Sequence, residues 1–323
     1  MSVLPLTIMT HPLPPEWITS LNGRVRLVVG PSDFAGIAPH LAENLEETEA
    51  ILCLLTDTIN LEIISKAPRL RVVSNMAVGV DNVDMAACTN RRIPVGNTPD
   101  ILTDATADMT MALLLSAARR LPEASADARD GLWRLWAPAG WLGADLRGAT
   151  LGIIGLGKIG KAVAERAIGF GIKVIYTDLQ PHKGIDAEFV SFNTLISQSD
   201  FISIHTPLNE STRGLIGENA LRKMKPTSIL VNAARGSIVD TSALVKALRE
   251  HWIAGAALDV TDPEPLPTDN PLFDMPNCLI VPHIGSATRN TRRRMAEMAC
   301  ENILAGLEGK NLPYCANPEI YQK

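Results

Sequence analysis

Residues 151–160, LGIIGLGKIG, carry the strongest structural signal in this chain. They form an apolar run of strand length, they match the pattern GxGxxG, and the helix-forming residues 158–169 follow at once. In such a strand–turn–helix unit the first glycine permits a tight turn, the second lets a ligand approach the backbone, and the third lets helix and strand pack closely. We therefore expect a diphosphate at the start of this helix, beside Gly155, Gly157 and Gly160. The alternative is a structural βα turn without a ligand.

A second apolar run, KVIYTD at 173–178, ends in an acid at about the distance that dinucleotide-binding units show. Asp178 is expected to accept hydrogen bonds from ribose hydroxyls and to repel a 2′-phosphate, which favours NAD over NADP. His182 and Lys183 follow closely. Beside the ribose they would soften this preference, but both are interpreted as solvated loop residues.

Short aliphatic runs alternate with helical patterns along the whole chain, which predicts parallel strands buried on both faces. The predicted strands lie at 26–30, 51–55, 71–76, 151–155, 173–178, 201–205, 228–232, 254–260 and 278–283. Predicted helices include 158–169, 241–250 and 289–308. This order indicates an α/β protein with doubly wound sheets.

The glycine-rich unit begins nearly halfway along the chain, and an inserted domain explains that position. Pro99 marks a break before a long helical segment, and Gly285 with Ser286 marks another before the last helix. We expect a dinucleotide-binding Rossmann domain at 100–287, inserted into a flavodoxin-like substrate domain made of 1–99 and 288–323.

The helical segment 101–121 is apolar on nearly every face between Met109 and Leu115. A helix of this kind is buried, either within one chain or between two subunits. Both interpretations stay open from the sequence, and we expect a homodimer.

Composition narrows the remaining classes of function. With 46% apolar and 20% charged residues the chain has ordinary globular usage, and its net charge of −5 makes nucleic acid an unlikely partner. Five scattered cysteines without CxxC spacing predict neither a disulfide framework nor a metal site. The chain shows no signal-peptide pattern and no apolar run of membrane-spanning length, so we expect a cytoplasmic protein without membrane partners.

Polar side chains follow three of the predicted strands, where the ligand crevice of a doubly wound sheet lies. Arg235 comes after 228–232, Asp259 ends the next strand and precedes Glu264, and His283 ends the last strand. Taken singly, each has an ordinary structural interpretation, such as an ion pair between Arg235 and Asp240. Together they suit hydride transfer to a carbonyl: histidine donates the proton, a carboxylate orients it, and arginine grips a substrate carboxylate.

The chain resembles the D-isomer-specific 2-hydroxyacid dehydrogenase family, and especially its glyoxylate and hydroxypyruvate reductase branch. The resemblance covers almost the whole chain, in the stretches AVGVDNVD (77–84), LTDATADMTMALLL (102–115), LGIIGLGKIGKAVAERAIGFG (151–171), HTPLNESTRGLI (205–216), ILVNAARGSIVD (229–240), AGAALDVTDPEPLP (254–267) and VPHIGSAT (281–288). It implies an NAD(P)-dependent oxidoreductase acting on small 2-keto or 2-hydroxy acids.

The resemblance also implies residue roles. Arg235, Glu264 and His283 would be catalytic, and Val78 and Gly79 would bind substrate through backbone amides beside Arg235 and His283. Besides the three glycines, cofactor contacts would come from Thr106, Lys158, Ile159, Asp178, Pro207, Thr212, Ala233, Asp259 and Ser286.

Two departures affect specificity. Val80 stands where the family often has an aromatic residue, and TDLQPHK lacks the arginine that NADPH-preferring relatives tend to carry.

Trp141 resembles a residue that reaches a neighbouring subunit in some relatives, or it packs beside Trp133 and Trp136. Two other functions stay open, a D-3-phosphoglycerate dehydrogenase and a non-enzymatic NAD(H)-sensing corepressor.

Overall fold

The computed structural model describes residues 4–34 and 36–322, which form two compact units. One unit contains the chain up to Leu102 and again from Thr288 onward, and the other is Thr103–Ala287. The chain therefore leaves the first unit at Leu102 rather than at residue 99, and it returns at Thr288. Each unit is built on its own parallel sheet, so the expected α/β class is confirmed.

The first unit has a five-stranded sheet in the order β2-β1-β3-β4-β5. The strands are β1 (Leu6–Met9), β2 (Arg26–Val29), β3 (Thr48–Cys53), β4 (Val72–Asn75) and β5 (Val95–Gly96). This is the strand order of flavodoxin-like sheets. The sequence pattern predicts neither β1 nor β5: β1 directly follows Pro5, and β5 has only two residues.

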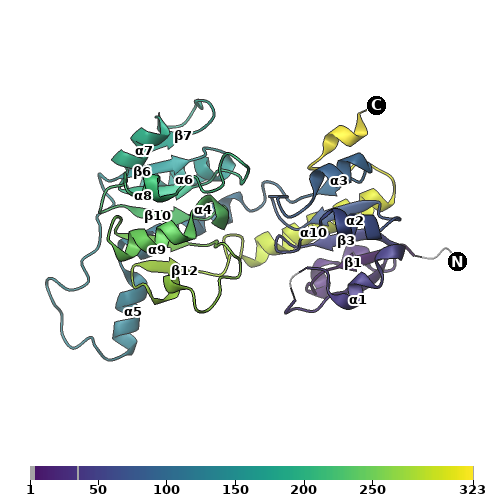
Figure 1. The fold of residues 1–323 in the computed structure, drawn as a ribbon, viewed down its shortest axis with the longest axis horizontal. Coiled ribbons are helices and arrows are strands. Elements are labelled where there is room, and N and C mark those ends of the chain that lie inside the picture. The colour runs from purple at the N-terminus through teal and green to yellow at the C-terminus, as the bar shows by residue number, and fades with distance from the viewer. Residues whose placement is uncertain (1–3, 35, 323) are drawn as a thin grey trace. The chain divides into compact units, whose positions relative to one another are not determined.

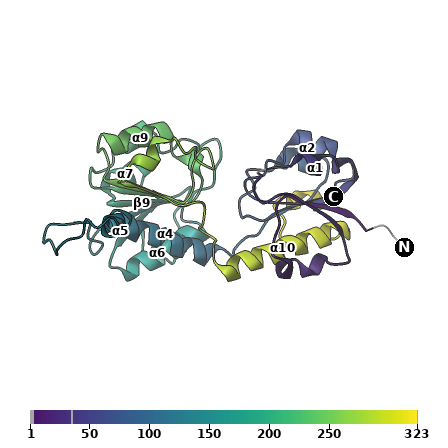
Figure 2. The same ribbon diagram turned by 90° about the horizontal axis from the view of Figure 1, so that it is seen from below.

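Helices cover both faces of this sheet (Figure 2). One face packs on α1 (Pro39–Ala42), α2 (Leu61–Lys66) and α3 (Met85–Asn90), and the other on α10 (Arg289–Leu307). Along β3 the side chains alternate, with Ile51 in one core and Leu52 in the other. The last long helix thus completes a core that the first hundred residues begin.

The second unit has a seven-stranded sheet in the order β12-β11-β10-β9-β6-β7-β8. The strands are β6 (Thr150–Ile154), β7 (Lys173–Thr177), β8 (Glu188–Phe189), β9 (Phe201–Ile204), β10 (Ile229–Asn232), β11 (Gly255–Leu258) and β12 (Cys278–Ile280). Because β6 lies between β7 and β9, the strand order reverses beside it. In such sheets ligands bind at the carboxyl ends of the strands near this reversal.

Helices also lie on both faces of the second sheet (Figures 1 and 2). Packed on one face are α7 (Phe192–Gln198), α8 (Glu218–Leu221) and α9 (Thr241–Arg249); α4 (Thr103–Ala118) and α6 (Lys158–Gly169) pack on the other. The helices predicted at 158–169, 241–250 and 289–308 agree with α6, α9 and α10 to within a residue at either end. The buried side of α4 belongs to this unit's own core.

The remaining helical segments are α5 (Leu121–Arg129) and short 3₁₀ turns at Pro15–Trp17, Thr19–Leu21, Leu45–Glu47, Gly236–Ile238, Pro271–Asp274 and Pro318–Tyr321. After α5 a long loop projects from the unit (Figure 1). Within the described residues, no helix combines the length and apolar character that crossing a bilayer requires.

Candidate cofactor-binding and active site

The glycine-rich turn joins β6 to α6, and its shape fits the roles expected from its sequence. Gly155 has φ +91°, and a Cβ there would lie 2.8 Å from the backbone nitrogen of Thr206. A Cβ on Gly160 would lie 2.3 Å from the carbonyl oxygen of Gly155, so helix and turn pack as closely as glycine allows. Gly157 precedes α6 without a side-chain cap and has open space where its Cβ would project. The helix start therefore has room and backbone donors for a diphosphate, and Lys158 and Ile159 form its first turn.

Asp178 directly follows β7, and its carboxylate holds the glycine-rich turn. One oxygen accepts the backbone N–H of Leu156 at 2.8 Å, and the other accepts that of Leu179 at 2.7 Å. Burial alone would raise the pKa of Asp178, but these donors and His182 outweigh it and lower the pKa. His182 Nε2 lies 3.1 Å from Asp178 Oδ2. The interpretation of His182 as a solvated loop residue is therefore wrong, because the imidazole is part of the candidate ribose site.

The segment after β10 is ordered by Asn232, a buried side chain at the strand end. Its Nδ2 donates to the carbonyl of Arg235 at 2.9 Å, and its Oδ1 accepts the N–H of Ala234 at 3.1 Å. Ala233 and Arg235 therefore lie on a short turn at the carboxyl end of the sheet. Asp240 caps α9 by accepting the N–H of Ala243 at 3.0 Å, so this carboxylate has a structural role.

Asp259 follows β11 and organises the segment that carries the histidine. Its carboxylate accepts the N–H groups of Ile284 at 2.6 Å and Gly285 at 2.8 Å, and its carbonyl accepts the N–H of His283 at 2.9 Å. Burial raises the pKa of this carboxyl, and the backbone donors and His283 only partly oppose that effect. Asp259 therefore holds the backbone of residues 283–285 in place.

His283 and Glu264 form a close polar contact in the site. His283 Nδ1 lies 2.5 Å from Glu264 Oε1, although 19 residues separate them. Both side chains are partly exposed, at 22% and 27%, so the pair is shielded but accessible. Because the carboxylate engages Nδ1, proton transfer to a substrate would fall to Nε2.

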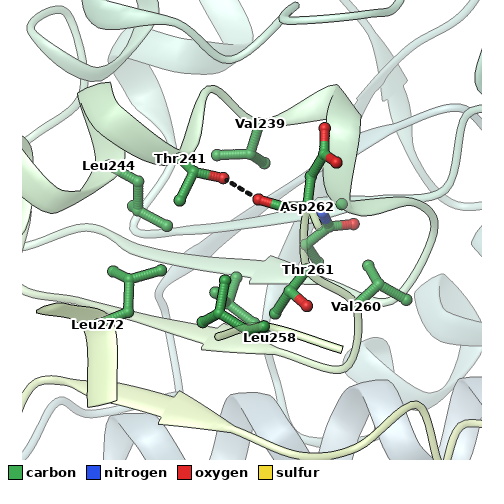
Figure 3. A pocket seen from close by; sticks show the side chains of 11 residues that line it. Val239, Thr241, Leu244, Leu258, Val260, Thr261, Asp262 and Leu272 are labelled. Atoms are coloured by element: carbon green, nitrogen blue, oxygen red, sulfur yellow. Dashed lines mark hydrogen bonds between the residues drawn. The ribbon is translucent and has the colours of Figure 1, made fainter. Parts of the chain in front are cut away.

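The loop that carries Glu264 is anchored at several points. Thr241 Oγ1 donates to the carbonyl of Asp262 at 3.0 Å (Figure 3), and Ser237 Oγ donates to the Asp262 carboxylate at 2.5 Å. Thr261 Oγ1 donates to the carbonyl of Pro263 at 2.8 Å.

Beneath this loop lies a small cavity of about 10 Å³, with apolar lining from Leu244, Leu258 and Leu272 (Figure 3). The anchoring hydroxyls of Ser237 and Thr241 lie close by, and the sequence analysis does not single them out. Ser237 and Thr241 precede Asp262 by 25 and 21 residues, so no local pattern linked them to this loop.

The other predicted cofactor residues lie in loops and on α4 of the same unit. Thr212 Oγ1 donates to the carbonyl of Pro207 at 2.7 Å, which closes the turn after β9. Thr106 on α4 lies beside Gly285, whose Cβ would be 3.4 Å from the Thr106 methyl group. Ser286 comes next after Gly285 and is partly buried.

Val78 and Gly79 lie in the first unit, in the loop after β4. The Val78 carbonyl accepts from Asn97 Nδ2, and the Gly79 carbonyl accepts from Asn75 Nδ2, both at 2.9 Å. Asn75 also donates to Asn82 at 2.8 Å. The sequence analysis does not single out Asn75 and Asn82, although a polar residue ending an apolar strand was a signal.

A doubly wound sheet with a glycine-rich turn at its switch point, and a histidine–carboxylate pair among the same strand ends, defines a nicotinamide-dependent oxidoreductase. Among the described residues no group of three or more His, Cys, Asp or Glu side chains is placed to hold a metal ion.

Comparisons with known proteins agree with this class. Residues 111–285 match the model of the D-isomer specific 2-hydroxyacid dehydrogenase NAD-binding domain. A glyoxylate reductase of Aeropyrum pernix is 50% identical over 288 residues, covering 87% of this chain and 86% of that protein. The crystal structure of the TT0316 protein of Thermus thermophilus superposes with a TM-score of 0.91 at 46% identity, covering 96% of this chain and 99% of that one.

A third similar protein is an NADPH-dependent glyoxylate/hydroxypyruvate reductase of Sinorhizobium meliloti, solved with NADP and malonate. It is 29% identical, with a TM-score of 0.85 and coverage of 97% of this chain and 96% of that one. The chain belongs to the D-isomer specific 2-hydroxyacid dehydrogenase family. It is an oxidoreductase that acts on CH–OH donors with a nicotinamide cofactor.

Proposed function

We propose that the chain reduces small 2-keto acids, glyoxylate and hydroxypyruvate first among them, with NADH preferred over NADPH. The observation that carries the proposal is the 2.5 Å contact between His283 Nδ1 and Glu264 Oε1 at the strand ends of the nucleotide-binding unit. The names of similar proteins, glyoxylate reductases among them, favour the same substrates.

In this proposal His283 is the proton donor in the reductive direction. A bound nicotinamide supplies the hydride. As negative charge grows on the carbonyl oxygen, a protonated imidazole donates from Nε2 while Glu264 holds Nδ1 and balances the charge. Asp259 fixes the backbone on either side of this histidine, so the ring direction is set before substrate arrives.

Arg235 is proposed to bind the substrate carboxylate, because a guanidinium presents two parallel donors to a carboxylate. The turn that carries it is held by Asn232. The backbone N–H groups of Val78 and Gly79 are proposed to contribute to substrate binding as well. Asn97 and Asn75 restrain that loop through its carbonyls.

A phosphorylated substrate would need extra basic side chains in the first unit, where Arg91 and Arg92 are the clearest candidates. The position of Arg91 argues against that role. Its Nη2 donates to the carbonyls of Ala67 and Pro68 at 3.1 and 3.2 Å, so this guanidinium stabilises the end of α2. For the cofactor, Asp178 supports NAD. We also propose a reducing compartment such as the cytoplasm, since all five cysteines are free.

We further propose a homodimer formed through the second unit. Leu132, Trp133, Leu135 and Trp136 on the loop after α5 are all at least 60% exposed. The unit also holds a groove of about 900 Å³ lined by residues of α4, α5 and the segment 271–279. Apolar exposure on this scale marks a protein–protein surface. Trp141 lies against its own chain, 5.4 Å from the Arg120 guanidinium.

The test of the catalytic assignment is the variant His283→Ala. NADH oxidation is measured with glyoxylate, hydroxypyruvate and pyruvate, and kcat is expected to fall by at least about 100-fold, as for loss of a general acid. His40→Gln is the control, because this exposed histidine lies in the first unit and its ring bonds to the Val29 carbonyl. An unchanged rate in His283→Ala would remove this residue from the mechanism.

A further inference from the structure

The ribose-binding candidate Asp178 has a partner that its expected role does not require. His182, four residues later, reaches back so that its Nε2 lies 3.1 Å from Asp178 Oδ2. Both side chains are partly buried, at 25% and 22% exposure. A solvated histidine would have no reason to hold this position, so the contact is part of the built site.

The backbone around His182 is fixed independently of Asp178. Its N–H donates to the hydroxyl of Tyr176 at 2.7 Å, and Tyr176 is buried against Phe189 with ring centroids 5.4 Å apart. The imidazole therefore starts from an anchored backbone, and holding it beside the carboxylate costs little additional conformational entropy.

This arrangement leaves the carboxylate with little free accepting capacity. Asp178 Oδ2 accepts from both Leu156 and His182, while Oδ1 accepts from Leu179. A carboxylate offers about four acceptor positions, so about one stays open for a ribose hydroxyl. The donors also offset part of the negative charge that would repel a 2′-phosphate.

We infer that His182 is a specificity-determining residue that acts through Asp178. By donating to the ribose-binding carboxylate it weakens the discrimination against the 2′-phosphate, so that the site accepts NADPH as well as the preferred NADH. The inference rests on the proposed cofactor site. It differs from a purely structural role, since a structural role would change the affinities for both cofactors together.

The experiment measures cofactor binding without turnover. The dissociation constants of NADH and NADPH are determined by fluorescence titration of the purified full chain, with no substrate present. The variants are His182→Ala, which removes the donor, and His182→Arg, which places a cationic donor at the same position. Lys183→Gln is the matched control, because it removes a neighbouring exposed charge from the same loop.

The ratio of the NADPH to the NADH dissociation constant is expected to rise about fivefold in His182→Ala, the size of a charge-assisted hydrogen bond partly open to solvent. It is expected to fall below the wild-type value in His182→Arg and to change less than about twofold in Lys183→Gln, since an exposed charge is screened. Equal ratios in the wild type, His182→Ala and His182→Arg would overturn the inference while leaving the cofactor site intact. Binding of neither dinucleotide to the wild type would overturn both.

Discussion

His283 has a backbone conformation that few residues with a side chain adopt. Its φ is +50°, in the left-handed region, which costs about 1–2 kcal/mol for a non-glycine residue. Its N–H donates to the carbonyl of Asp259, and the next two N–H groups donate to the Asp259 carboxylate. Three bonds to one residue hold the strained turn, and the turn aims the imidazole at Glu264. Strain at such a position is typical of functional sites.

His205, at the end of β9, couples stability to pH. Burial lowers its pKa to about 4, while Nε2 lies 2.7 Å from Ser203 Oγ. In the unfolded chain a histidine has a pKa of about 6.5, the value found in model peptides. Between about pH 6.5 and 4 the unfolded chain therefore binds the proton that the folded chain refuses. The stabilising contribution is complete above about pH 6.5 and is lost as the pH falls.

We expect the free energy of unfolding to drop about 1–2 kcal/mol more between about pH 7.5 and 5 in the wild type than in His205→Gln. Urea unfolding at the two pH values, followed by circular dichroism, measures the difference. His40→Gln serves as the control for loss of an exposed histidine. Identical pH dependence in the wild type and His205→Gln would contradict this account of the buried ring.

At the level of secondary-structure elements, the turn after β10 and the loop after β11 meet without space between them. A Cβ on Gly236 would lie 1.9 Å from the carbonyl oxygen of Thr261. One side of this contact carries Arg235, and the other leads to Glu264. Backbone packing therefore couples the two segments, and the hydroxyl of Thr241 adds a bond to the same loop.

Gly236→Ala is expected to lower both stability and activity, because neither backbone segment can yield to the added methyl group. The expected loss is about 1–3 kcal/mol in the free energy of unfolding, as for overpacking, with a clear fall in kcat. Gly169→Ala is the matched control, since a Cβ there meets no atom within 4 Å. Thermal unfolding and steady-state kinetics compare the stability and kcat of the two variants. Equal stability and equal kcat would show that the loops are not coupled through this contact.

For the molecule as a whole, the two sheets have separate cores, and the apolar loop after α5 belongs to neither. Trp133 and Trp136 are 74% and 81% exposed, and they do not appear in any of the four core clusters of the described residues. Two tryptophans left in water are costly, and a second subunit would cover them.

The double variant Trp133→Ser with Trp136→Ser is expected to be a monomer of 34.8 kDa, whereas the wild type is expected to have twice that mass. Sedimentation velocity measures both. Leu61→Ser is the control, because this exposed leucine lies on α2 of the first unit. A wild type that sediments as a monomer would contradict the dimer proposal.

Local features of this protein could be predicted from the amino-acid sequence. The glycine-rich turn, the strands on either side of it and helices α6, α9 and α10 depend on residue periodicity and on glycine geometry, which nearby residues set. The strands β1, β5 and β8 escaped prediction; β5 and β8 have only two residues each, and β1 directly follows Pro5. His182 and Asp178 are only four residues apart, but their contact depends on a loop conformation that residue periodicity does not predict. Long-range packing was needed to bring His283 to Glu264 and to place Asp259 beneath the backbone beside them. These contacts depend on loop conformations that distant residues hold in place, and no local pattern encodes such packing.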